Sequence, residues 1–248
     1  KRYRGLERIQ KNPEGMLTMK EKRRPEVRFR KFSDDWEQRK LGEIAEVVGG
    51  GTPSTGNPEY WDGNIDWYAP AEIADQIYVK SSLRRITEQG YNNSSAKMLP
   101  AGTVLFTSRA GIGKTAILER KGCTNQGFQS IVPHKGELDS YFIFSRTEEL
   151  KRYGEMTGAG STFVEVSGKQ MANMELMMPP KIEEQMSVGS FFRNLDNLIT
   201  LHQRECRQRP ISYICYLLRL ASLPPRLPPV SVPHCTARSA GRRSGAWR

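Results

Sequence analysis

The most regular pattern of apolar residues lies toward the C-terminal end of the chain. After Pro179 and Pro180, the seam positions recur in alternating steps of three and four, with two further apolar residues beside them: Val188, Phe191, Phe192, Leu195, Leu198, Ile199 and His202. This spacing is that of a heptad seam, which packs lengthwise against another long helix. We therefore predict a coiled-coil-type helix over residues 179–205, with Pro180 at its first position and Glu183 and Glu184 at the positive end of its dipole.

Before this helix, the apolar pattern is that of a mixed α and β domain. Short runs rich in β-branched and aromatic residues are bounded by turn-forming residues, and five of them predict strands: Ile65–Ala69, Gly102–Ser108, Lys114–Leu118, Gln129–Pro133 and Phe163–Val166. Residues 140–153 instead place apolar side chains at helical spacing, with Gly154 as the predicted stop. We expect an α+β domain with a twisted mixed sheet over residues 27–178.

The two ends of the chain differ from this domain in composition. Residues 1–31 carry 12 Lys/Arg against 4 Asp/Glu, and residues 206–248 carry 8 Arg, no acidic residue and 6 of the 15 prolines. Neither end shows a sustained apolar period. We expect residues 1–26 to be a disordered basic lead-in and residues 206–248 to be a disordered tail that resembles an out-of-frame ending.

The distribution of charge limits what the net charge of +11 implies. Such a charge usually indicates a polyanionic partner, but here the two ends carry most of it. Residues 32–205 hold 18 basic and 23 acidic residues. A nucleic-acid site in the domain must therefore rely on a local patch and on hydrogen bonds, because no general positive field surrounds the domain.

Metal, disulfide and membrane functions have little support in the residues. The cysteines show neither a CxxC pairing nor a histidine at zinc-ligand spacing: Cys123, Cys206, Cys215 and Cys235. His134 and His202 lie far from any carboxylate or cysteine pattern. The apolar run at 211–223 is interrupted by Arg219 and is too short to span a bilayer. We expect a protein of the reducing cytoplasm without a membrane segment.

One sequence resembles a phosphate-binding loop but does not fit it. Residues 111–115 read Gly-Ile-Gly-Lys-Thr, and a phosphate loop needs a further glycine five residues before Gly113. That position is Ser108. We therefore interpret the segment as a strand-turn-strand with Lys114 at its mouth.

Residues of about 27–205 resemble the DNA-specificity subunits of type I restriction-modification systems. The resemblance rests on an ordered series of motifs, in the order Phe32–Glu43, Gly50–Ser54, Asp66–Tyr68, Thr107–Gly113, Asn125–Gln129, Gly160–Phe163 and the helix Glu184–Ile199. Subunits of this family carry two target-recognition domains, each reading one half of a split DNA sequence. Long helices between the domains act as spacers and dock the methyltransferase subunits. The present sequence holds one such domain and the start of one such helix.

The resemblance implies a non-catalytic DNA reader in which cofactors belong to partners. S-adenosylmethionine, ATP and Mg would be bound by the methyltransferase and restriction subunits, and the restriction subunit would be contacted only indirectly. The implied partner of the domain is double-stranded DNA. The implied role of the helix 179–205 is to dock methyltransferase subunits or a second copy of the chain.

Polar residues of the turns are the implied DNA contacts. Their side chains can bond phosphates or base edges, arginine suiting guanine and asparagine or glutamine suiting adenine: Thr52, Ser54, Asn57, Ser108, Arg109, Lys114, Asn125, Gln126, Gln129, Ser161 and Thr162. From the residues alone, the alternative is that these side chains are ordinary polar groups of turns and strand ends, without a DNA contact. Tyr60 and Trp61 are interpreted as core or rim aromatics.

Two other functions remain open on the sequence. A stand-alone methyltransferase or nuclease would need a cofactor-binding or carboxylate-lysine motif, and we find neither a glycine-rich S-adenosylmethionine turn nor an Asn/Asp-Pro-Pro-aromatic signature. A decayed remnant that folds poorly would account for the unusual composition of both ends. The DNA half-site cannot be deduced, because readout depends on loop geometry and DNA shape.

Overall fold

The structure is a computed structural model of the 248-residue chain. The residues that it describes are 9–11, 17–19, 25, 27–74, 76–109, 111–158 and 165–208. Ser161, Thr162, residues 163–164 of the predicted strand 163–166 and the tail after residue 208 lie outside these residues, and Glu165 and Val166 form no strand. The chain divides into two compact units, Lys1–Leu198 and Ile199–Arg248. The fold and the candidate site below belong to the first unit.

A five-stranded mixed sheet forms the centre of the first unit. In spatial order its strands are β4 (Ala45–Gly49), β11 (Gln129–Pro133), β8 (Val104–Phe106), β9 (Thr115–Leu118) and β6 (Tyr78–Val79). Neighbouring strands are antiparallel except for β9 and β6, which are parallel. The predicted strands at 102–108, 114–118 and 129–133 are thus confirmed, the last with its predicted bounds.

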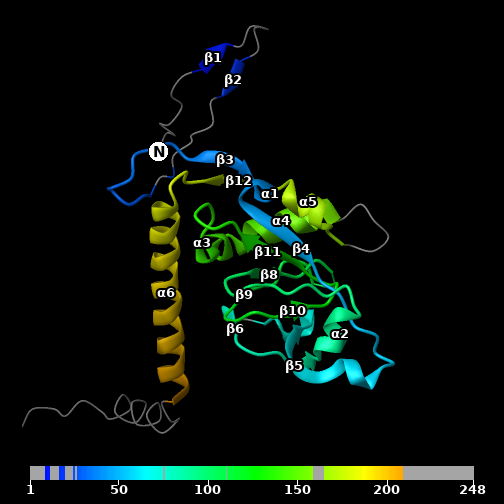
Figure 1. Ribbon diagram of the computed structural model, residues 1–248. Coiled ribbons are helices and arrows are strands. Elements are labelled where there is room, and N and C mark those ends of the chain that lie inside the picture. Colours follow the sequence, from blue (N-terminus) through cyan, green and yellow to red (C-terminus); the bar gives the residue numbers. More distant parts are fainter. Residues whose placement is uncertain are drawn as a thin grey trace, which may run out of the picture. The chain divides into compact units, whose positions relative to one another are not determined.

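Alternation along the strands divides the apolar side chains between two cores. In β8, Val104 and Phe106 face one core and Leu105 faces the other, as the twofold period of a strand requires. The helices covering the first face are α1 (Leu41–Ile44), α3 (Ser140–Ser145), α4 (Thr147–Gly158) and α5 (Gly168–Ala172). Figure 1 shows these helices on the opposite side of the central sheet from β5 and α2.

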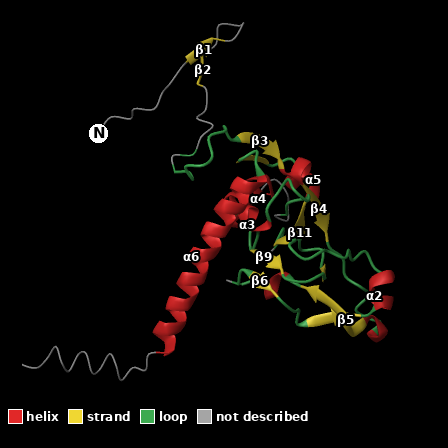
Figure 2. Cartoon of the chain, turned by 60° about the vertical axis from the view of Figure 1, so that its left-hand side comes forward, coloured by secondary structure: helices red, strands yellow, loops and turns green. Residues whose placement is uncertain are grey.

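A second sheet lies on the other face of the first. It has the order β10 (Cys123–Thr124), β5 (Trp61–Tyr68) and β7 (Arg84–Ile86), with β5 parallel to β10 and antiparallel to β7. The short helices beside it are η1 (Pro58–Tyr60), η2 (Pro70–Glu72) and α2 (Glu88–Asn92). Figure 2 shows β5 next to α2. The strand predicted at 65–69 is confirmed, although β5 begins four residues earlier.

Two further strand pairs were not predicted. β3 (Glu37–Lys40) pairs antiparallel with β12 (Glu175–Met178), although residues 41–174 lie between them in the sequence. Within the lead-in expected to be disordered, β1 (Ile9–Lys11) and β2 (Leu17–Met19) pair as a short antiparallel hairpin. These strands are only three or four residues long, so their sequence pattern of apolar and polar residues does not distinguish them from coil.

The helix predicted at 140–153 is two helices in the structure. α3 ends before Arg146, and α4 then continues beyond the predicted stop to Gly158. Gly154 lies inside α4, where a Cβ would stand 2.9 Å from Ile112 and 3.0 Å from the Phe106 ring. The glycine therefore permits close packing of α4 on the core and does not end the helix.

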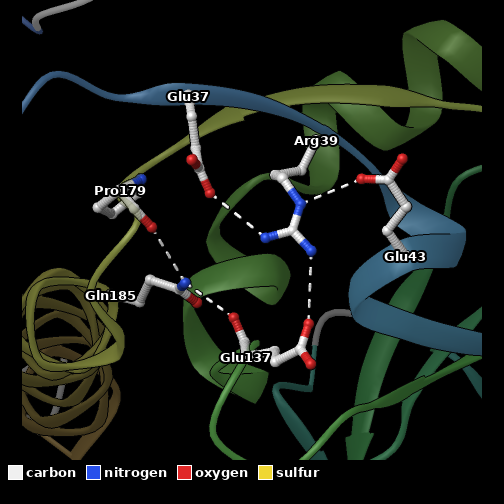
Figure 3. A network of polar contacts seen from close by, with 6 residues as sticks. All are labelled: Glu37, Arg39, Glu43, Glu137, Pro179 and Gln185. Atoms are coloured by element: carbon white, nitrogen blue, oxygen red, sulfur yellow. Dashed lines mark hydrogen bonds and ion pairs between the residues drawn. The ribbon is translucent and has the colours of Figure 1, made fainter.

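The long helix α6 (Ile182–Gln208) begins two residues after Pro180 and ends three residues after the predicted limit. Gln185 fixes its first turn, since its side-chain amide donates to the carbonyl oxygens of Glu137 (2.9 Å) and Pro179 (3.2 Å). Figure 3 shows this contact beside Arg39, which pairs with Glu37, Glu43 and Glu137. In the part of the chain that the structure describes, no helix combines the length and the apolar character needed to cross a bilayer.

Candidate nucleic-acid interface

Three loops that carry the predicted contact residues are joined by backbone hydrogen bonds. The Gly51 N–H donates to the Thr124 carbonyl oxygen (2.9 Å), which ties the loop after β4 to the loop after β10. The Ser108 N–H donates to the Gly127 carbonyl oxygen (2.8 Å), and the Val166 N–H donates to the Ser108 carbonyl oxygen (3.2 Å). The loops at 50–57, 124–128 and 107–114 therefore form one continuous surface.

Close approach of the backbones explains the glycines of the first loop. A Cβ on Gly50 would lie 2.0 Å from the Asn125 carbonyl oxygen, and one on Gly51 would lie 2.3 Å from the Ser95 hydroxyl. Side chains at these positions would push the loop at 50–57 away from its neighbour. The glycine-rich sequence thus brings Thr52 within reach of the loop at 124–128.

Thr52 and Gln126 are brought together by this approach. The Thr52 hydroxyl donates to the Gln126 side-chain oxygen, while Gln126 itself is exposed. Asn125 and Asn57 use their side-chain oxygens locally, accepting from the N–H groups of Gly127 (2.9 Å) and Glu59 (3.1 Å) respectively. These turns orient the two asparagines and occupy only their oxygens, so their NH₂ groups remain as donors.

The turn at 107–114 is the predicted strand-turn-strand and not a phosphate loop. Thr107 closes it, because its hydroxyl donates to the Gly111 carbonyl oxygen (2.7 Å) and accepts from the Lys114 N–H (3.0 Å). Gly111 and Gly113 have φ values of 104° and 98°, which L side chains rarely adopt. Lys114 is exposed and lines a cavity of about 850 Å³ together with Lys151.

Arg109 already has an acidic partner. Its Nε lies 2.7 Å from a carboxylate oxygen of Glu165, and the two side chains are 46% and 35% exposed. Exposed ion pairs of this kind are weak and exchange readily with solvent and ions. Arg109 can therefore contact an anion if Glu165 moves aside, whereas Lys114 carries its charge on the opposite arm of the turn.

Two predicted contact residues are buried, Ser108 fully and Gln129 in part. The Ser108 side chain is fully buried, and its hydroxyl has no hydrogen-bond partner among the described residues. The predicted contact of the Ser108 hydroxyl with DNA is therefore corrected: in this conformation its backbone joins the loops. Gln129 is half-buried and its side-chain oxygen lies against Gly49 and Gly168, because β11 carries it beneath α5. Ser54 is exposed, and Ser161 and Thr162 lie outside the described residues.

Two tryptophans support the loop at 50–57: Trp61, which the sequence analysis interpreted as a core or rim aromatic, and Trp67, which it named only within the Asp66–Tyr68 motif. The indole N–H of Trp67 donates to the Gly51 carbonyl oxygen (2.8 Å), and that of Trp61 donates to the Ser54 carbonyl oxygen (3.1 Å). Their rings meet edge to face at 5.2 Å. Arg84 lies over the Trp61 ring, 3.6 Å from its centroid. The sequence signal was present in the Asp66–Tyr68 motif, but it does not reveal which loop the indoles support.

Cys123 lies behind these loops as a packing residue. It is fully buried, and burial raises the pKa of its thiol to about 12. At neutral pH the sulfur is thus a protonated thiol, which is a poor nucleophile and a poor metal ligand. Among the described residues, no group of three or more His, Cys, Asp or Glu side chains is placed to hold a metal ion.

The predicted seam of α6 is covered at its beginning and exposed further along. Val188 packs against the first core, and the Phe191 ring meets Phe29 edge to face at 6.1 Å. The segment at 27–36 and α6 enclose a largely apolar groove of about 340 Å³ here. From Phe191 onward the seam residues are exposed, with exposed fractions of 37% for Leu195 and 62% for Leu198.

The other seam residues extend this exposed face. Phe192 and Ile199 are 42% and 55% exposed, and His202 is also exposed. Tyr141 of α3 holds the middle of α6, donating its hydroxyl proton to an Asp196 carboxylate oxygen at 2.6 Å. Burial, followed by this hydrogen bond, raises the pKa of Tyr141 far above its usual value.

Comparisons with known proteins agree on one family. The model of the type I restriction modification DNA specificity domain matches residues 33–208. The specificity subunit of the type I restriction enzyme MjaIX from Methanocaldococcus jannaschii is 38% identical over 172 residues, which are 68% of this chain and 40% of that protein. The EcoR124I/EcoR124II specificity subunit from Escherichia coli is 30% identical over 203 residues, which are 77% of this chain and 49% of that protein.

Solved structures show the same fold. A chain from a structure describing complex assembly and conformational transition of the type I R-M system superposes with a TM-score of 0.57 at 18% identity, covering 75% of this chain and 43% of that chain. The HsdS subunit from Thermoanaerobacter tengcongensis gives a TM-score of 0.52 at 18% identity, covering 68% and 39%. The chain spans less than half the length of each of these relatives.

Proposed function

Because this chain belongs to the family of type I restriction modification DNA specificity domains, we propose that it is a non-catalytic reader of one half of a bipartite DNA target. The observation that carries the proposal is the joining of three polar loops by hydrogen bonds: Thr52 bonds Gln126, and the backbone of Ser108, next to Arg109, bonds Gly127. Side chains from separate loops can then contact neighbouring base pairs and the phosphates that flank them.

Each exposed group has a DNA chemistry that suits it. The Gln126 amide can bond an adenine edge, since it offers one donor and one acceptor in a plane. Arg109 and Lys114 supply positive charge for phosphates, and the hydroxyls of Thr52 and Ser54 supply neutral hydrogen bonds. Because residues 32–205 are acidic overall, these local groups have to provide the attraction that the domain as a whole lacks.

A binding-site selection on random DNA duplexes at a fixed salt concentration tests this proposal. The purified chain should enrich one short sequence, and adding the cognate methyltransferase subunit should sharpen the enrichment without changing the sequence. Enrichment of no sequence under either condition would contradict a role in sequence recognition. Retention on all duplexes alike would indicate only the electrostatic binding expected of the basic ends.

Paired variants separate the loop surface from general effects. Gln126→Ala should relax discrimination at one base pair by about 1–3 kcal/mol, the usual worth of a bidentate base contact. Asn173→Ala removes an equally exposed amide after α5 and serves as the matched control. An equal loss of discrimination in both variants would place the reading surface elsewhere.

We also propose that α6 is the docking element of the chain. Its exposed face carries large apolar residues, whose burial is worth about 25 cal/mol per Å². The occupant that we propose is the same helix of a second copy, in an antiparallel homodimer, with a methyltransferase subunit as the alternative occupant. A two-fold dimer would place two identical domains on an inverted repeat with a gap.

Sedimentation at tens of micromolar distinguishes these occupants. The wild-type chain should show a concentration-dependent dimer, and Leu195→Glu with Leu198→Glu should abolish it, because each change would bury a charge in the seam. Ser190→Glu with Asn197→Glu adds the same charge at exposed positions outside the seam and should leave the dimer intact. A monomer that also fails to bind the methyltransferase subunit would contradict a docking role.

The proposal leaves catalysis and cofactors to other subunits and places the chain in the cytoplasm with them. S-adenosylmethionine would act in the methyltransferase subunit, and ATP and Mg in the restriction subunit, which would reach this chain only through the methyltransferase. Methyl transfer or DNA cleavage by the purified chain alone, with S-adenosylmethionine or Mg²⁺ added, would overturn this assignment. A chain without a cooperative thermal transition would instead be a remnant.

A further inference from the structure

Arg84 differs from the other arginines near the loop surface in the partner of its guanidinium group. Arg109 is paired with Glu165, while Arg85 and Arg120 both pair with the buried carboxylate of Asp66, at 3.4 Å and 2.7 Å. Arg84 instead lies over the Trp61 ring, 3.6 Å from its centroid. Within the described residues, no carboxylate lies at ion-pair distance from Arg84.

The strand register places Arg84 on the side of the sheet that supports the loop at 50–57. Arg84 is opposite Trp67 in the antiparallel pair of β7 and β5, and Arg85 is opposite Asp66. Side chains of directly paired residues share a face, and successive residues alternate between faces. Arg84 therefore stands with the two tryptophans, whereas its neighbour Arg85 points to the other face with Asp66.

The same tryptophans connect Arg84 to the candidate DNA surface. Trp61 and Trp67 each hold a carbonyl oxygen of the loop at 50–57, at Ser54 and Gly51. That loop in turn carries Thr52, which bonds Gln126. A chain of contacts thus leads from Gln126 through Thr52 and the two buried indoles to the exposed Arg84.

Stacking on an aromatic ring prepares a guanidinium for paired acceptors. The ring fixes the plane of the group and leaves the N–H donors at its edge accessible, so less rotational freedom is lost when a ligand binds. Arg84 is exposed, and none of the described carboxylates lies within ion-pair distance of it. Guanine offers two acceptors, O6 and N7, in the plane that such a fork fits.

We propose that Arg84, held over the Trp61 ring, reads a guanine in the DNA bound by the loop surface. This rests on the proposed function, because it assigns one base pair of the target to one side chain. Trp61 is then a positioning residue, and Arg84 determines specificity at that base pair. The ordinary alternative is that Arg84 only shields the tryptophan from water and has no contact with DNA.

Affinities for single-substitution duplexes test the proposal. The site selected by the wild-type chain is changed one base pair at a time, and each duplex is titrated by fluorescence anisotropy at one salt concentration. The wild type should lose affinity by about 5- to 160-fold when the contacted G·C pair is replaced. Arg84→Ala should bind both duplexes equally at that position and should still discriminate at every other position.

Two further variants complete the design. Arg84→Lys keeps the charge but not the planar fork, so its affinity for the selected site should fall only a few-fold while discrimination at the G·C pair is lost. If Arg84→Ala lowers the melting temperature, Arg84→Lys is used in its place to test the proposal. Arg152→Ala removes an exposed arginine of α4 and should leave discrimination unchanged.

Three results would contradict the proposal, and each points to a different conclusion. A uniform loss of affinity on all duplexes, with the salt slope reduced by about one, would make Arg84 a phosphate contact and overturn base reading. Wild-type affinity and discrimination in Arg84→Ala would leave it with the shielding role alone. Failure of the wild-type chain to select any sequence would instead overturn the proposed function, and the assignment of Arg84 with it.

Discussion

Removal of the Glu184 carboxylate is the sharpest test of how α6 is attached to the domain. Glu184 lies in the first turn of α6 and receives both branches of the Arg28 guanidinium, at 2.6 Å and 2.7 Å. The Trp36 indole N–H donates to the same carboxylate at 3.2 Å. The side chains of Glu184 and Arg28 are 2% and 12% exposed. Glu184→Ala would leave the guanidinium buried without its counter-charge and the indole without its acceptor.

The expected cost follows from the burial of the pair. Removing one partner of a buried ion pair usually destabilises a protein by 3–5 kcal/mol, because the other charge stays desolvated. Arg28 retains some contact with water, so we expect a loss near the lower limit, about 3 kcal/mol. For a domain of this size, such a loss lowers the melting temperature by about 6–12 °C. The reverse change, Arg28→Ala, strands the more deeply buried carboxylate and should cost about 4–5 kcal/mol.

Urea unfolding of the single variants and of one double variant measures these values. Arg28→Met combined with Glu184→Leu replaces the pair by apolar groups and should restore stability to within about 1 kcal/mol of the wild type. Glu183→Ala changes the exposed neighbour of Glu184 and should shift the midpoint very little. A loss below about 1 kcal/mol in Glu184→Ala, matching that control, would refute the inference that this pair fastens α6 to the domain.

Three further outcomes are expected. Arg109→Ala with Lys114→Ala should weaken DNA binding without unfolding the domain, and titration against salt should show a slope smaller by about one for each lost phosphate contact. Gly113→Ala should lower the free energy of unfolding, measured by urea denaturation, by at least about 1–2 kcal/mol. The reason is that φ is 98° there and the new Cβ would clash with the side chain of Lys151. Tyr141→Phe removes the bond to Asp196 and should cost about 1.5–3 kcal/mol in the same assay.

The two changes that are tested by unfolding each have a matched control. Gly136→Ala places a Cβ at a φ of 82° with nothing within 4 Å, so any excess loss in the Gly113 variant reports the clash. Tyr78→Phe alters a tyrosine that is 37% exposed and should be nearly neutral. Equal losses in variant and control would contradict the reasoning in either case, and unchanged DNA binding after the double charge removal would move the DNA surface away from the turn at 107–114.

Strands with strong local patterns were predictable, and those defined by distant partners were not. The run at 129–133 is apolar in its centre, and its bounds as β11 follow from the sequence. β3 reads Glu-Gln-Arg-Lys, a polar stretch that becomes a strand only because β12 pairs with it. The continuation of α4 past Gly154 likewise depends on close packing against Phe106 and Ile112.

The sequence predicted which residue types form the candidate site better than it predicted which of them are exposed. The sequence singled out Thr52 and Gln126 separately, and the fold brings them into contact through the close approach at Gly50. It gave no sign that Ser108 would be buried, because burial depends on β8 lying between β11 and β9. It also could not connect Arg84 with Trp61, since their contact arises from the register of β7 on β5.

The pairing of β3 with β12 gives the recognition domain adjoining points of connection. Glu37 stands opposite Met178, so the chain enters and leaves the domain on neighbouring strands. A domain whose two connections lie side by side can be exchanged as a cassette, since a graft has to match only one strand pair and the salt bridges beside it. Under the proposed function, two proteins that share this strand pair could therefore exchange their loops through two crossovers and gain a different DNA target, while the attachment of α6 stays the same.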